Sequence, residues 1–141
     1  MQKFIFGWFA ITFSLSALAG TSIFGNWNGT LIKSNVGYAC SPSDLAITND
    51  GSHLYIKLSA GCSISPMTKV FAIKEGGLFL GTENVGTISA DEISIVKRPG
   101  PFGGPIFILQ IEMKNTELSY LESVEGSSHD YAISGKFVLT K

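Results

Sequence analysis

Residue types that carry catalytic chemistry are few and scattered in this sequence. Its 141 residues include two histidines, His53 and His129. His129 precedes Asp130, but adjacent side chains on an extended strand point to opposite faces, so this pair does not form a catalytic dyad. A Ser-His-Asp arrangement stays open, because its members need not be close in sequence. No G-x-S-x-G motif accompanies these residues, and we therefore expect no enzyme.

Metal and cofactor sites are also not indicated by the sequence. The cysteines Cys40 and Cys62 have neither a C-x-x-C spacing nor a nearby histidine cluster. Asp91 and Glu92 would act as a carboxylate pair only if a turn folds them together. The sequence contains no phosphate-binding loop and no dinucleotide-binding fingerprint, so we expect no cofactor and no metal.

The remaining candidates for binding lie around one irregular loop. Residues 98–105 contain three prolines and three glycines, which cannot pair as a strand. Arg98 could meet an acidic head group, while Phe102 and the inner apolar residues Phe107 and Tyr120 take a chain or ring. This combination suits a small apolar or amphipathic ligand at a barrel mouth. Alternatively, the loop only turns a wide corner, with Arg98 solvated and Phe102 tucked against the barrel.

Apolar residues that alternate with polar ones predict the elements that carry this loop. Such runs occur around residues 27–32, 45–48, 54–60, 106–113, 116–124 and 131–140, with shorter runs at 70–74, 78–80, 86–89 and 92–96. Turn signals separate them, including an Asp-Gly step at Asp50 that favours a tight hairpin turn with positive φ angles. We predict an all-β fold, an antiparallel up-and-down barrel of about eight strands, since closure removes exposed edges.

The acidic residues Glu112, Glu117, Glu122 and Glu125 form a mild group on these strands. We interpret the group as a solvated strand face. Several large aromatic side chains could fill the inside of the barrel: Trp27, Phe71, Phe79, Phe107, Tyr120 and Phe137. An eight-stranded barrel is either just filled or holds one small ligand, and the sequence leaves that choice open.

The first residues predict export. Met1-Gln2-Lys3 is a short basic start, residues 4–18 are mostly apolar, and Ala17-Leu18-Ala19 is an A-x-A cleavage pattern. We expect a signal peptide at 1–19, a single domain at 20–141, and a periplasmic or extracellular location with no membrane span after signal removal. In an exported chain, the cysteine pair predicts one disulfide, Cys40–Cys62.

Charge excludes one class of partner. The formal net charge is −1, and Arg98 is the only arginine, so the basic face that nucleic-acid binding requires is lacking. The expected partners are therefore a small apolar or amphipathic ligand, or another protein that contacts the loops.

The start of the first strand resembles a known family. Gly25-Asn26-Trp27 is a G-x-W motif, and a meander of strands follows it, which together resemble the lipocalins and the wider calycin group. The resemblance implies that Trp27 closes one end of the barrel. The family's arginine near the last strand is replaced here, so that Lys136 or Lys141 would have to cover the tryptophan.

A second, local resemblance follows from Trp27, the two cysteines and the run Phe71–Leu78. This pattern is similar to the small periplasmic barrels that inhibit secreted metalloproteases, although the arm before Gly25 is shorter here than in that family. Three roles stay open at this point: a ligand-binding barrel, a protein-binding module such as a protease inhibitor, and a structural envelope protein with a filled barrel.

Overall fold

The computed structural model describes residues 22–33, 39–60, 67–128 and 130–140. They form ten β-strands: β1 (Gly25–Lys33), β2 (Ala39–Asn49), β3 (His53–Ala60), β4 (Met67–Lys74), β5 (Gly77–Leu80), β6 (Glu83–Ile88), β7 (Glu92–Lys97), β8 (Ile106–Lys114), β9 (Glu117–Glu125) and β10 (Tyr131–Leu139). Within these residues, no helix is long and apolar enough to cross a membrane.

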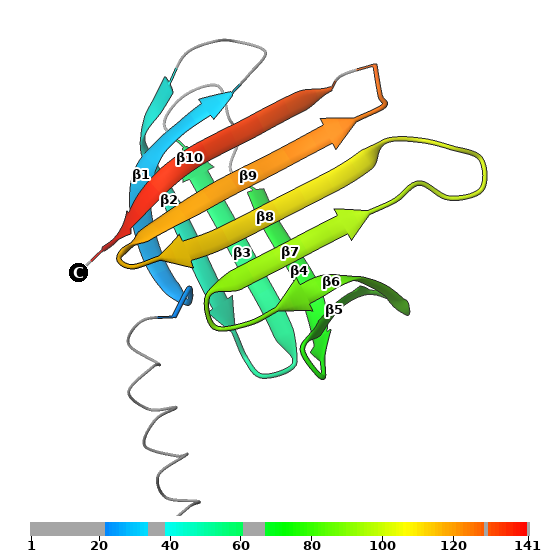
Figure 1. The fold of residues 1–141 in the computed structure, drawn as a ribbon, viewed down its shortest axis with the longest axis horizontal. Helices are drawn as coiled ribbons and strands as arrows, with labels where there is room; N and C mark the ends of the chain where they lie inside the picture. Colours follow the sequence, from blue (N-terminus) through cyan, green and yellow to red (C-terminus); the bar gives the residue numbers. More distant parts are fainter. Residues whose placement is uncertain (1–21, 34–38, 61–66, 129, 141) are drawn as a thin grey trace, which may run out of the picture.

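The strands close into one antiparallel barrel, in which each strand pairs with its neighbours in sequence and β1 pairs with β10. In Figure 1, β7–β10 cross the front of the molecule and β2–β4 pass behind them. The predicted fold class is confirmed, but the expected number of about eight strands is wrong. The barrel has ten, because each of the ten alternating runs, including the short ones that become β5 and β6, forms a separate strand.

Period-2 alternation sets which residues face the barrel interior. On β3, Leu54, Ile56 and Leu58 are buried, with at most 1% of their surface exposed. The same rule buries Leu109 and Ile111 on β8. The inward positions on the other strands complete one core, which includes Trp27, Leu31, Leu45, Ile47, Phe71, Leu78, Ile93, Ile95, Leu118, Tyr120, Ile133 and Phe137.

Two turns show how the hairpins are made. At the β4–β5 turn, Glu75 and Gly76 have φ angles of 52° and 78°, the positive values of a tight primed turn. At the β2–β3 turn, only Gly51 has a positive φ, of 91°. Among the described residues, Glu75 and Asn115 are the only non-glycine residues with positive φ. Asp50 therefore shapes its turn through its carboxylate rather than through a left-handed backbone.

Close approach of β1 and β10 depends on glycine. A Cβ atom at Gly135 would collide with the carbonyl oxygen of Thr30 and the side chain of Leu31. Gly135 pairs with Leu31 on β1, and its missing side chain leaves room for the side chains of Leu31 and Phe137.

One end of the barrel is closed by the segment that precedes β1. Ile23 has no exposed surface, and its N–H donates to the carbonyl of Ala90 in the β6–β7 turn at 2.8 Å. The indole Nε1 of Trp27 donates to the carbonyl of Ile23 at 2.9 Å. Trp27, 2% exposed, thus lies under a strap of chain at this end. Lys136 does not cover it, because its Nζ donates to Ser119 Oγ at 2.9 Å on the outer face.

Three expectations concern residues outside the described part of the chain. The predicted signal peptide at 1–19 lies there, and so do Cys62 and Lys141. Cys40 is buried with 1% of its surface exposed, and the Cys40–Cys62 disulfide stays a prediction.

Candidate functional site

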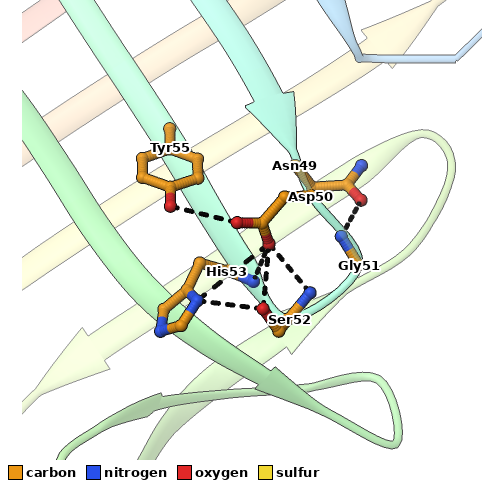
Figure 2. A network of polar contacts seen from close by, with 6 residues as sticks. All are labelled: Asn49, Asp50, Gly51, Ser52, His53 and Tyr55. Carbon is orange, nitrogen blue, oxygen red and sulfur yellow. Dashed lines mark hydrogen bonds and ion pairs between the residues drawn. The ribbon is translucent and has the colours of Figure 1, made fainter.

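A serine, a histidine and an aspartate do meet at the β2–β3 turn (Figure 2). Ser52 Oγ lies 3.0 Å from Asp50 Oδ1 and 3.1 Å from His53 Nδ1. In a catalytic triad the histidine uses one ring nitrogen for the serine and the other for the carboxylate. Here Nδ1 faces both, at 3.1 Å from the serine and 4.0 Å from Asp50 Oδ1. These three side chains therefore lack the triad geometry.

The Asp50 carboxylate instead organises the turn. It accepts hydrogen bonds from the N–H of Ser52 at 2.9 Å and of His53 at 2.8 Å, and from Tyr55 Oη at 3.2 Å (Figure 2). Hydrogen bonds from the Ser52 and His53 backbone lower the pKa of Asp50 to about 2, because they stabilise the ionised form. This cluster is a structural cap on an exposed hairpin.

The other polar sequence candidates also serve turns. Asp130 accepts from the N–H groups of Gly126 and Ser127, and these bonds lower its pKa. His129 lies outside the described residues. Asp91 accepts from Ser89 Oγ at 3.0 Å and lies in the turn before β7, where Glu92 begins the strand. Across the described ranges, no group of three or more histidine, cysteine or acidic residues could hold a metal ion.

The four residues expected to bind a ligand are not brought together. Arg98 and Phe102 lie on the β7–β8 loop and are exposed, and the Phe102 ring is 101% exposed, so it does not tuck against the barrel. Tyr120 is buried inside the barrel, with 2% of its surface exposed. Phe107 is half-buried and packs against the core.

The middle of the barrel is filled by side chains. A side chain with no exposed surface has no water-sized space beside it, either outside the barrel or within it. Residues at 0% exposure come from strands all around the barrel: Leu31, Ile47, Leu54, Leu78, Ile93, Ile95, Leu109, Ile111 and Leu118. These side chains leave no space for a ligand among them. Trp27, Phe71, Tyr120 and Phe137 are buried in this core, as expected, whereas Phe79 is half-buried with Lys74 Nζ 5.6 Å from its ring centroid.

A buried carboxylate lies inside the barrel beside this core. Glu122 has no exposed surface, which makes the solvated-face interpretation wrong for this residue. Its Oε1 accepts from Tyr120 Oη at 2.6 Å and its Oε2 from Tyr131 Oη at 2.6 Å. Lys69 Nζ is 3.1 Å from Oε1. Both carboxylate oxygens are therefore satisfied, as a buried charge requires.

This carboxylate changes the chemistry of the tyrosines. Burial, followed by the charge and the hydrogen bond of Glu122, raises the pKa of Tyr120 far above its usual value. Burial and the hydrogen bond to Glu122 likewise raise the pKa of Tyr131. Both phenols stay protonated and act as hydrogen-bond donors. The sequence does contain a signal for the inward placement of Glu122. This residue follows Leu118 and Tyr120 at every second position of β9, so alternation puts its side chain inside the barrel.

The wall of the barrel opens next to this cluster, between β4 and β7. β4 pairs with β5 only through Ala72–Lys74, and β7 pairs with β6 only through Ile93–Ile95. The first part of β4, residues 67–71, and the end of β7, residues 96–97, extend beyond these pairings. The short β5–β6 hairpin at the lower right of Figure 1 bridges the two strands only in part. We call this opening the slot.

A pocket of about 310 Å³ occupies the slot. Its wall is mostly apolar, with two lysines, and consists of Lys69, Val70, Phe71, Leu80, Lys97 and Phe107. Lys69 connects the pocket to the interior, since its Nζ lies 5.6 Å from the ring centroid of Phe107 and also contacts Glu122. Two of the apolar side chains at the pocket are exposed: Val70 is 44% exposed and Leu80 39%.

Two other depressions lie on the outer surface. One, of about 570 Å³, crosses β1, β10 and β9 between Ile32 and Leu121. Its lysine, Lys136, is engaged with Ser119 and with Glu117, 3.6 Å away. The other, of about 350 Å³, is lined mainly by polar residues, including Asp44 and Lys57. Of these three depressions, the slot is the one that lies at an interruption of strand pairing and reaches the interior through Lys69, so we take it as the candidate site.

Comparisons with known proteins agree with the fold and leave the family open. No protein-family model and no curated protein matches the sequence. Among solved structures, a redesigned beta barrel matches with a TM-score of 0.50 and 13% identity, covering 87% of this chain and 96% of that chain. The REP1-NXSQ fatty acid transporter matches with a TM-score of 0.52 and 16% identity, covering 84% of this chain and 96% of that chain. At these identities the similarity shows the barrel fold alone.

Proposed function

We propose that this chain is an exported β-barrel protein that binds a small apolar or amphipathic ligand in the slot between β4 and β7. The observation that carries this proposal is the slot itself, a pocket of about 310 Å³ with a mostly apolar lining and a rim of exposed apolar side chains. Soluble proteins expose clustered apolar surface mainly where they bind something. Pockets for small molecules span roughly 300–1,000 Å³, so this one suits a small ligand or the end of a longer chain.

Because the interior is filled, the slot is favoured over the barrel lumen as the ligand-binding site. A ligand in the lumen would have to displace core side chains such as Ile93 and Leu109, which have no exposed surface. A ligand in the slot covers Val70 and Leu80, which already face water. Burial of this exposed apolar surface favours binding without a cost in core packing.

A titration with a fluorescent fatty acid, 11-(dansylamino)undecanoic acid, tests the proposal. The choice of a fatty acid follows the fatty acid transporter among the structures of similar fold. We expect saturable binding by the wild type and weaker binding by a Val70→Thr/Leu80→Gln double variant. A Val138→Thr variant is the matched control, because Val138 is 58% exposed and does not line the slot. No binding by the wild type, or equal binding by both variants, contradicts the proposal.

A second candidate function rests on the β7–β8 loop. Phe102 is fully exposed at the tip of this loop, where an aromatic side chain is available to a protein partner. This feature favours a protein-binding module, such as an inhibitor of a secreted protease. A Phe102→Ala variant separates the two functions, because it should leave binding of the fluorescent fatty acid unchanged while weakening inhibition of a secreted metalloprotease.

A further inference from the structure

The slot contains two lysines on opposite sides, and each is paired with a glutamate. Lys69 on β4 lies 3.1 Å from Glu122 Oε1. Lys97 on β7 lies 3.0 Å from Glu83 Oε1, and its Nζ also donates to the carbonyl of Arg98 at 3.1 Å. The two pairs differ in how readily a ligand can replace the glutamate.

The Lys69–Glu122 pair is fixed. The Glu122 side chain has no exposed surface, and both of its oxygens accept hydrogen bonds from tyrosines at 2.6 Å. Removal of Lys69 from this carboxylate would leave a buried charge without its cation, which is strongly unfavourable. Tyr120, Tyr131 and Lys69 thus bind a carboxylate that the chain itself supplies, and they do not exchange it for the acid group of a ligand.

The Lys97–Glu83 pair is exchangeable. The Lys97 side chain is 38% exposed and that of Glu83 is 51% exposed. Ion pairs at such exposure contribute little to stability, because water solvates both charges when they separate. Glu83 pairs with Leu80 in the β5–β6 hairpin, so it lies at the rim of the pocket while Lys97 lines it.

We infer that the ligand carries an acidic group that binds Lys97 Nζ and replaces Glu83 there. This inference rests on the proposed function of the slot. Glu83 then acts as a built-in competitor, since its carboxylate and that of the ligand use the same ammonium group. The apolar part of the ligand contacts Val70, Leu80 and Phe107. A neutral ligand of the same length gains the apolar contacts but does not displace Glu83.

Calorimetric titration with dodecanoate and with dodecanol, both kept below their aggregation limits, tests this inference. Glu83→Gln removes the competitor and should tighten dodecanoate binding about two- to fivefold, the range that an exposed ion pair supplies. Lys97→Met should weaken dodecanoate binding about two- to fivefold, because the exposed ion pair between its ammonium group and the carboxylate of the ligand is lost. Binding of dodecanol should stay within a factor of two for both variants.

An exposed ion pair away from the slot provides the control. Lys114 lies 3.5 Å from Glu112 on β8, with 82% and 40% of the two side chains exposed. Glu112→Gln and Lys114→Met make the same chemical changes as the two slot variants, and should alter the binding of neither compound.

The outcomes separate this inference from the function on which it rests. If dodecanol and dodecanoate both bind but respond equally to Lys97→Met, or if Glu83→Gln weakens dodecanoate binding, the inference is wrong and the slot remains a site for apolar ligands. If neither compound binds the wild type, the proposed function fails, and the inference fails with it.

Discussion

The end of the barrel around Trp27 and the wall between β4 and β7 contain similar apolar residues but differ in how strand pairing closes them. Around Trp27, β1 pairs continuously with β10, and the Ile23 strap covers the end. At the slot, residues 67–71 of β4 and residues 96–97 of β7 extend past their pairing with β5 and β6. Ile23 and Trp27 are buried at the first place, whereas Val70 and Leu80 are exposed at the second. The limited pairing of these strands thus leaves an exposed apolar surface in the wall without emptying the core.

The packed end should give the largest loss of stability on mutation. We expect Trp27→Ala to lower the free energy of unfolding by about 3–5 kcal/mol, since it leaves a cavity and removes the hydrogen bond to Ile23. Urea unfolding followed by circular dichroism measures the change. Phe102→Ala, at a fully exposed position, should change it by less than about 0.5 kcal/mol. A loss under about 1 kcal/mol for Trp27→Ala would show that this end is not packed as described.

The buried carboxylate of Glu122 contacts Lys69 of the slot, and its removal should have the next largest effect. Glu122→Gln keeps the shape but leaves Lys69 without its anion and one tyrosine hydroxyl without an acceptor. Because Lys69 is 19% exposed and can reach water, we expect a loss of about 2–3 kcal/mol. Glu117→Gln, an exposed position on the same strand, is the control. Equal effects of the two changes would contradict the buried network.

The tyrosines in this network predict a loss of stability in alkali. The pKa of Tyr120 is raised above its model-compound value of 10.0 in the folded protein, so its contribution to stability is fully present below pH 10 and is lost as the pH rises further. The loss should approach about 1.4 kcal/mol per pH unit for Tyr120. Unfolding by urea between pH 9 and pH 11.5 measures it, and Tyr120→Phe should flatten the dependence. Ionisation of Tyr120 near pH 10 in the folded protein, seen at 295 nm, would contradict the prediction.

The slot should show the smallest effect on stability. Val70→Thr and Leu80→Gln alter side chains that are 44% and 39% exposed, and each should change the free energy of unfolding by less than about 0.5 kcal/mol. The same variants weaken ligand binding if the slot is the site. Thermal unfolding without ligand provides the measurement, and a loss above about 2 kcal/mol would place these side chains in the core instead.

Local pattern was sufficient to predict the barrel and much of its core. The alternation of Leu54, Ile56 and Leu58 places them inside whatever the register, because side chains on a strand alternate faces. The same rule places Glu122 inside, whereas the acidic type of its side chain favours a solvated strand face, which is wrong for this residue. Its partner Lys69 lies on β4, and no local pattern pairs residues so far apart in sequence.

The slot itself could not be predicted from local pattern. It depends on where the pairing of β4 with β5 and of β6 with β7 stops, which is a property of register. Phe107 was correctly placed on the inner face, where it lines the pocket. The length and irregularity of the β7–β8 loop point to Arg98 and Phe102 as ligand contacts, but these two residues do not line the pocket.

Methyl NMR during a titration with dodecanoate tests the central contrast most directly, because it reports on both regions in one experiment. The account predicts shifts for the methyl groups of Val70 and Leu80 at the slot, with those of Ile93 and Ile111 in the filled interior unchanged. Large shifts at Ile93 and Ile111, with none at the slot, would show that the ligand enters the barrel lumen and would contradict the account.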